Sequence, residues 1–152
     1  MLNLFKEYLK QGHVKRKTPD PEEAKALLEK SLARLEYFKK RKITERASSI
    51  VLENTYESIR EATQALMSLK GFKPYSHEAT IHFLIEIYCH DFTEEEFRKF
   101  DRFRLLRNNS VYRAEPVTKE DSESCKKFSE IMLNKIKLLY KKESKGKDKL
   151  KP

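Results

Sequence analysis

Arg104 and Arg107 are the residues whose type and spacing most directly suggest chemistry. They stand three positions apart in the stretch FRLLRNNSVYRAEP (103–116), on one side of an expected helix. That side also carries Phe97, Phe100 and Val111. A guanidinium beside apolar residues pairs with a carboxylate, reaches the rim of its helix face, or points into a cavity that accepts an anion. Ion pairs to Glu53, Glu57 or Asp101 and an anion-binding cleft are therefore the competing expectations.

Two polar residues on another expected helix, over 43–70, bear on the same question. Asn54 and Ser58 interrupt, in the middle of that helix, an otherwise apolar core stripe that includes Ile50. Buried polar side chains cost a few kcal/mol unless they are paired. They either bond across the core or line a wet cleft, and in the second case they are candidates for the wall that faces the arginines.

Other chemistries have little support. His82, Glu86 and His90 share one face of an expected helix, but a metal site also needs ligands from a second element, so we expect a polar outer face and no metal. The sequence has no Gly-x-Ser-x-Gly motif and no Cys–His motif. Its three glycines make a phosphate loop built from backbone improbable. We expect no cofactor.

Capping signals and apolar periodicity predict the helices that must position these residues. Asp20 and Pro21 begin one helix, Thr93 and Glu96 form a capping box for another, and Gly71 ends the long one. The predicted helices cover about 2–11, 21–42, 43–70, 76–90 and 118–139, and a basic connector covers 13–20. A further predicted helix begins at Thr93, is loosened near its end by Asn108 and Asn109, and is stopped by Pro116. Short connections make neighbouring helices antiparallel, so we predict an all-α, up-and-down bundle of about five helices.

Composition agrees with one helical domain. With 152 residues, only three Gly and five Pro, the chain lacks the turns of a many-stranded sandwich or barrel. We divide it into an N-terminal helical extension and basic connector (1–18), a bundle (19–140), and a basic tail expected to be disordered (141–152). Each end carries a charge of +4 out of a total of +9, which leaves +1 for the bundle. Net charge therefore does not predict a general nucleic-acid-binding face.

The sequence also suggests where the protein works. Cys89 and Cys125 follow no disulfide or zinc pattern, and a reducing cytoplasm is the simplest expectation. No apolar run approaches the roughly 18 to 20 residues that span a bilayer, and the N-terminus does not resemble a secretion signal. We expect a cytoplasmic protein that does not enter a membrane.

Two segments resemble a known family. RNNSVYR (107–113) is similar to the motif region of the HEPN family, in which an Arg near a helix end is followed by a polar residue and, several positions later, a His. ENTYESIREATQALMSLKGFKPYSHEATIHFL (53–84) resembles the earlier half of many archaeal and bacterial HEPN proteins. The resemblance covers about 20–140. It implies a helical bundle that dimerises and sets the two motif arginines on either side of a shared cleft.

The resemblance also implies roles for residues. Arg107 matches the motif Arg and Asn108 its polar neighbour, while Tyr112 falls where active ribonucleases of the family have a His. A phenol, with an ordinary pKa near 10, is a weak base at neutral pH compared with an imidazole near 6.5. Some members instead carry a Tyr that a partner nucleotidyltransferase modifies with adenylate.

These observations predict a HEPN-like homodimer that binds a nucleotide or RNA in a cleft. Arg104 and Arg107 would hold phosphate, Asn108 would orient it or bond a base or ribose, and Tyr112 would stack or donate a hydrogen bond. Membership of a toxin–antitoxin pair with a minimal nucleotidyltransferase fits the resemblance. One alternative is a metal-independent endoribonuclease in which Tyr112 or Ser110 replaces the His, with Arg107 steadying the phosphate. Another is an interaction module with no ligand.

Overall fold

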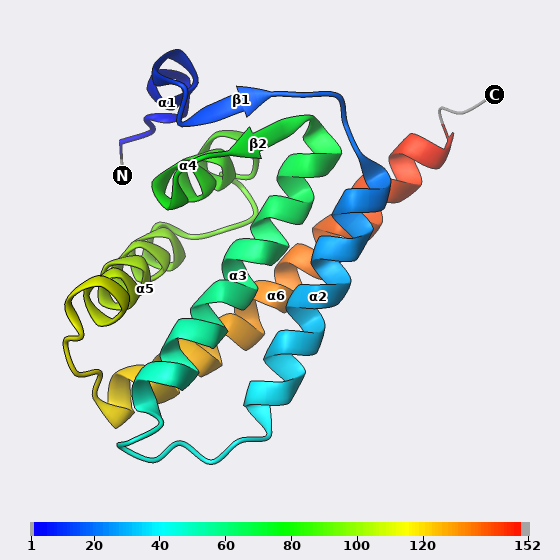
Figure 1. Cartoon of the computed structure of the whole chain (residues 1–152). Helices are drawn as coiled ribbons and strands as arrows, with labels where there is room; N and C mark the ends of the chain where they lie inside the picture. The colour runs from blue at the N-terminus through cyan, green and yellow to red at the C-terminus, as the bar shows by residue number, and fades with distance from the viewer. Residues whose placement is uncertain (1, 150–152) are drawn as a thin grey trace.

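The computed structural model describes residues 2–149 and the side chains of 2–145, and it confirms the all-α prediction (Figure 1). Six helices and one small sheet make up these residues. They are α1 (Phe5–Gln11), β1 (Val14–Arg16), α2 (Pro21–Lys39), α3 (Ser48–Lys70), β2 (Phe72–Pro74), α4 (His77–Ile87), α5 (Glu94–Arg113) and α6 (Lys119–Lys149). Between residues 2 and 149 no helix combines the length and the apolar character needed to cross a membrane.

Helix ends follow the local signals of the sequence. The Asp20 carboxylate accepts a hydrogen bond from the backbone N–H of Glu23 at 3.0 Å. The predicted capping box of α5 is complete, because the Thr93 hydroxyl and the Glu96 carboxylate each accept from the other residue's backbone N–H. Gly71 ends α3 in the left-handed region, with φ of 82°. These caps satisfy backbone groups that the helices cannot satisfy internally.

Helix α3 is the centre of the bundle. It packs along α2 on one side and α6 on another, and it also contacts α4 and α5 (Figure 1). Its fully buried side chains include Leu52, Tyr56 and Ile59, and aromatic residues of α5 and apolar residues of α6 close the core around them. The buried face of α6 includes Cys125, Phe128, Met132, Ile136 and Leu139.

The predicted connector between the first two helices contains a strand that the sequence did not reveal. Val14–Arg16 pairs antiparallel with Phe72–Pro74, with Val14 opposite Pro74 and Arg16 opposite Phe72. Three residues give too little alternation to recognise as a strand. The pairing fastens the start of the chain to the segment between α3 and α4 (Figure 1).

Two predicted helices differ from the structure. Helix α3 begins at Ser48, because residues 45–47 form a turn. Ile50, which we predicted in the core stripe, is 54% exposed. Helix α5 continues through Asn108 and Asn109 to Arg113. Tertiary packing extends α5 past residues of low helix propensity.

The predicted tail also differs from the expectation. Helix α6 continues past residue 140 to Lys149, so residues 141–149 form its last turns. Lys70 at the end of α3 makes an ion pair of 2.8 Å with Glu143 on this part of α6. Residues 150–152 lie outside the described part of the chain.

The N-terminal segment docks on the bundle, as we expected of a helix too short to be stable alone. Phe5 of α1 is buried edge-on against Phe72 and Phe83. The backbone N–H of Leu4 donates to Nδ1 of His82 at 3.2 Å. Residues 2–16 therefore belong to the packed body of the protein.

Two glycines provide a matched test of this arrangement. Gly12 and Gly71 both have positive φ, but a Cβ on Gly71 would lie 2.6 Å from the carbonyl oxygen of Lys17, whereas one on Gly12 would meet nothing within 4 Å. We expect Gly12→Ala to lower the free energy of unfolding by about 1 kcal/mol and Gly71→Ala by about 3 kcal/mol. Urea unfolding followed by circular dichroism measures both, and equal losses would contradict the close approach of Lys17.

Candidate functional site

Arg104 meets the first of the competing expectations, an ion pair with its own chain. The residue is 9% exposed. Its Nε donates to the Asp101 carboxylate at 2.9 Å, a second guanidinium nitrogen lies 2.8 Å from the same carboxylate, and the third lies 3.3 Å from Glu78 on α4. The predicted phosphate-binding role of Arg104 therefore has a structural competitor, because two carboxylates already complete its charge.

Arg107, one turn further along α5, differs. Its guanidinium donates to the side-chain oxygen of Asn108 at 3.1 Å and lies 5.7 Å from the centre of the Tyr112 ring. No carboxylate among the described side chains lies within ion-pairing distance of it. The residue as a whole is half-buried. The three motif residues Arg107, Asn108 and Tyr112 do lie together, with Tyr112 75% exposed.

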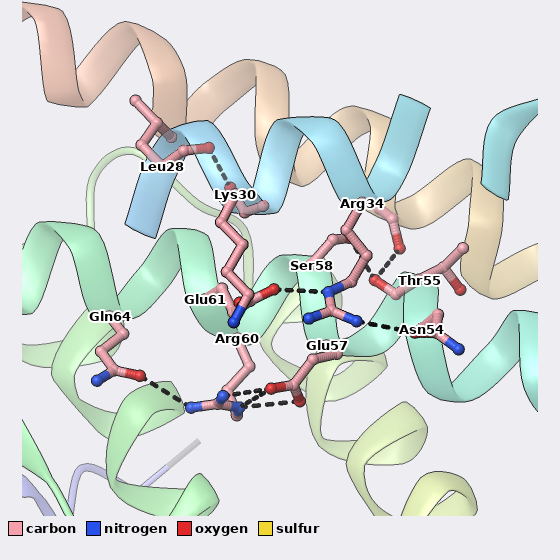
Figure 2. A network of polar contacts seen from close by, with 12 residues as sticks. Leu28, Lys30, Arg34, Asn54, Thr55, Glu57, Ser58, Arg60, Glu61 and Gln64 are labelled. Carbon is pink, nitrogen blue, oxygen red and sulfur yellow. Dashed lines mark hydrogen bonds and ion pairs between the residues drawn. The ribbon is translucent and has the colours of Figure 1, made fainter. Parts of the chain in front are cut away.

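Asn54 and Ser58 have partners inside the bundle, which Figure 2 shows. The Asn54 amide accepts a hydrogen bond from Arg34 of α2 at 2.9 Å and donates to the carbonyl of Ile50. Ser58 is buried and donates to the carbonyl of Thr55 at 2.6 Å. Asn54 therefore bonds across to a neighbouring helix, which is the first of the two expectations. Ser58 bonds to the backbone of its own helix. Neither has a contact with Arg107.

A second polar group lies at the junction of α3, α4 and α5, and sequence reasoning missed it. The Tyr56 hydroxyl and Nδ1 of His77 are 3.1 Å apart, and the two rings are stacked with centres 5.9 Å apart. Tyr56 also packs its edge against Phe100 of α5. Glu78, which follows His77, holds Arg104. These contacts place the first turn of α4 against the face of α5 that bears the two arginines.

The electrostatics of this junction keep both rings neutral. Burial lowers the pKa of His77 to about 4, and the positive charges of Arg60 and Arg107 act in the same direction. Burial also raises the pKa of the Tyr56 phenol. Because the pKa of His77 lies well below 7, the imidazole is uncharged at neutral pH. Arg107 therefore acts electrostatically on an uncharged imidazole and disfavours its protonation.

Arg60 borders the same junction but is held by its own helix. Its Nε lies 3.1 and 3.0 Å from the two carboxylate oxygens of Glu57, and it also donates to Gln64 (Figure 2). Although burial acts to raise the pKa of Glu57, the hydrogen bonds and charge of Arg60 lower it overall. Glu57 therefore stays ionised and compensates Arg60. Arg107 is left as the cation of the junction without such a partner among the described residues.

The residues considered for a metal do not form a site. His82 accepts from Leu4, Glu86 accepts from Asn3, and His90 lies beyond the end of α4. The described part of the chain has no group of three or more His, Cys, Asp or Glu side chains arranged to hold a metal ion.

The chain was compared with known proteins. No protein-family model matches it, and no curated protein matches it. The resemblance to HEPN proteins therefore stays a prediction from the quoted segments.

The closeness of Arg107 to His77 can be tested by titration. Replacing Arg107 with Ala removes a positive charge that disfavours the imidazolium, so we expect the pKa of His77 to rise toward its ordinary value of 6.5. NMR of the imidazole C–H signals against pH measures this shift, with His77→Gln to assign the signal. Arg113→Ala, on the exposed last turn of the same helix, is the matched control. An unchanged or lower pKa in Arg107→Ala would contradict the proximity.

Proposed function

We propose that this protein is a HEPN-like helical protein that binds the phosphate of a nucleotide or of RNA at Arg107. In this proposal Asn108 orients the phosphate or bonds a ribose or base, and the exposed Tyr112 stacks or donates a hydrogen bond. Arg104 serves to hold α5 on α4 through its ion pairs. The protein acts in the cytoplasm, within a toxin–antitoxin pair whose partner is a small nucleotidyltransferase.

The observation that carries this proposal is the uncompensated charge of Arg107. Partly buried cations are normally paired, and every other guanidinium of the junction has a carboxylate. A phosphate would supply the missing anion in two parallel hydrogen bonds. A phosphate is disfavoured in the hollow of about 320 Å³ that Ser110 lines, because acids line it as well: Glu45, Glu53 and Glu115.

Exposed apolar residues near Arg107 support a homodimer as part of the proposal. Ile50, Val111 and Tyr112 are all substantially exposed. Ser49 and Ser110 line one hollow, so the start of α3, which carries Ile50, lies beside the end of α5, which carries Val111 and Tyr112. A second copy covering this region would bring two Arg107 side chains toward a shared cleft. Sedimentation at equilibrium would then report twice the chain mass of 18.1 kDa.

Substitution of Arg107 tests the binding site. We expect Arg107→Ala to weaken binding of ATP or of a short labelled RNA by roughly 10-fold or more, because a charge-assisted pair of hydrogen bonds is lost. Fluorescence anisotropy measures the RNA and calorimetry the ATP. Arg98→Ala, an exposed arginine on the opposite end of the same helix, is the control and should bind as the wild type does. Indistinguishable curves for the two variants and the wild type would remove Arg107 from the proposal.

One observation favours a second candidate function, a metal-independent endoribonuclease. His77 is an uncharged imidazole that responds to the charge of Arg107, whereas the sequence offered only Tyr112 or Ser110 as a base. Its pKa of about 4 leaves it free to accept a proton at neutral pH but makes it a weaker base than an ordinary imidazole. When Nδ1 carries the proton and donates to Tyr56, Nε2 has a free lone pair that can accept the proton of a ribose 2′-hydroxyl. In the other tautomer, Nε2 donates to a phosphate oxygen and assists binding alone.

Cleavage assays separate the two functions. For an endoribonuclease we expect RNA to be cut in the presence of a chelator, leaving cyclic-phosphate ends, with the rate reduced about 100-fold or more in His77→Gln and in Arg107→Ala. Tyr112→Phe should keep the activity, because its exposed hydroxyl is not the base. Loss of cleavage in Tyr112→Phe with full activity in His77→Gln would assign the base to Tyr112 instead.

A further inference from the structure

Basic residues gather around the α2–α3 connector and the start of α6, at the bottom of the view in Figure 1, and none of them belongs to the Arg107 site. A hollow of about 450 Å³ lies between the α2–α3 connector and the first turns of α6. Five cations line it, together with two acids: Arg41, Lys42, Lys119, Lys126 and Lys127, with Glu123 and Glu130. The hollow therefore carries a net charge of +3. Among the described side chains, none of the five cations lies within ion-pairing distance of a carboxylate.

Two features make this surface more than a solvated charged face. The Debye length at physiological salt is about 8 Å, so cations around one hollow repel one another with little screening. Lys119 adds to this repulsion, because it sits on the first turn of α6, where the helix dipole is already positive. A bound anion would reduce both the repulsion among the cations and the unfavourable interaction of Lys119 with the helix dipole.

An aromatic platform adjoins the basic hollow. Tyr37 is 55% exposed, and the guanidinium of Arg41 lies over its ring at 4.1 Å. Tyr37, Lys40 and Arg41, with Glu36, line a second hollow of about 350 Å³, so Arg41 borders both hollows. Phe38 supports Tyr37 edge-on, with ring centres 5.0 Å apart. An exposed aromatic ring beside a guanidinium is the kind of surface on which an unpaired base stacks.

We propose that the surface formed by Tyr37, Arg41, Lys42, Lys119, Lys126 and Lys127 binds a single-stranded nucleic acid. The phosphodiester chain lies along the lysines of α6 and the connector, while an unpaired base stacks on Tyr37 beside Arg41. Stacking without contacts to base edges makes binding tolerant of sequence. A duplex is disfavoured, because its bases are already stacked on one another. The surface does not depend on Arg107, which it does not include.

The test compares two pairs of lysines on the same helix. Lys126→Gln/Lys127→Gln removes two charges from the hollow, and Lys141→Gln/Lys142→Gln removes two exposed charges from the far part of α6 as the matched control. Labelled single-stranded RNA, single-stranded DNA and duplex DNA are titrated by fluorescence anisotropy over a series of salt concentrations. Each lysine that contacts a phosphate of a single strand contributes about 0.7 to the slope of log K against log salt.

We expect Lys126→Gln/Lys127→Gln to weaken single-strand binding about 10-fold and to reduce the salt slope by about 1.4. Tyr37→Ala should weaken it at least about 5-fold, with little effect on the duplex. Preference for RNA over DNA would assign a role to the ribose hydroxyl, and equal binding would assign recognition to the shared phosphate chain and bases. The proposal is overturned if the control pair weakens binding as much, or if Tyr37→Ala binds single strands normally.

The outcome is distinguishable from that for the proposed function. Binding that is lost in Arg107→Ala but kept in Lys126→Gln/Lys127→Gln would overturn this inference and leave the Arg107 proposal standing. Binding that is lost in Lys126→Gln/Lys127→Gln but kept in Arg107→Ala would support this surface and overturn the Arg107 proposal.

Discussion

The structure depends on the requirement that polar groups carried by the buried helix α3 find partners within the bundle. Glu61 is the clearest case, since its side chain is 3% exposed. Nε of Arg34 lies 2.7 Å from it, and Lys30 lies 3.4 Å from its other oxygen, so α2 brings two cations to one buried carboxylate (Figure 2). A buried carboxylate without partners would be strongly destabilising. The position of α2 on α3 is therefore fixed by charge as well as by apolar contact.

The same requirement explains why one cation stands out at the junction of α3, α4 and α5. Glu57 compensates Arg60, and Asp101 with Glu78 compensates Arg104. The Tyr56–His77 pair meets the requirement differently, because both groups stay neutral and share a hydrogen bond. Among the described side chains, the partners of Arg107 are an amide and an aromatic face. The proposal of an anion at Arg107 therefore rests on the comparison of this residue with its compensated neighbours.

Features that act within a few residues of the chain, such as helix caps, were predicted from the sequence. Contacts between residues far apart in the chain were not. The caps at Asp20, Thr93 and Gly71 act within one turn of the residue that carries them, and each was found from sequence. The contact of His77 with Tyr56 joins residues 21 positions apart, on helices whose relative rotation no periodicity supplies. The stripe containing Ile50 was misplaced for a similar reason, because α3 is buried on several sides and does not have a single apolar face.

The docking of the N-terminal segment has a consequence for how short the functional unit can be. The Tyr8 hydroxyl of α1 donates to Glu78 at 2.7 Å, and Glu78 is also a counter-ion of Arg104. The opening residues thereby reach, through one shared carboxylate, the helix face on which Arg107 stands. A shortened protein beginning at Pro21 would keep the long helices, yet it would uncover Phe83 and loosen the anchor of α5. The minimal unit that preserves the arginine face therefore starts before α1.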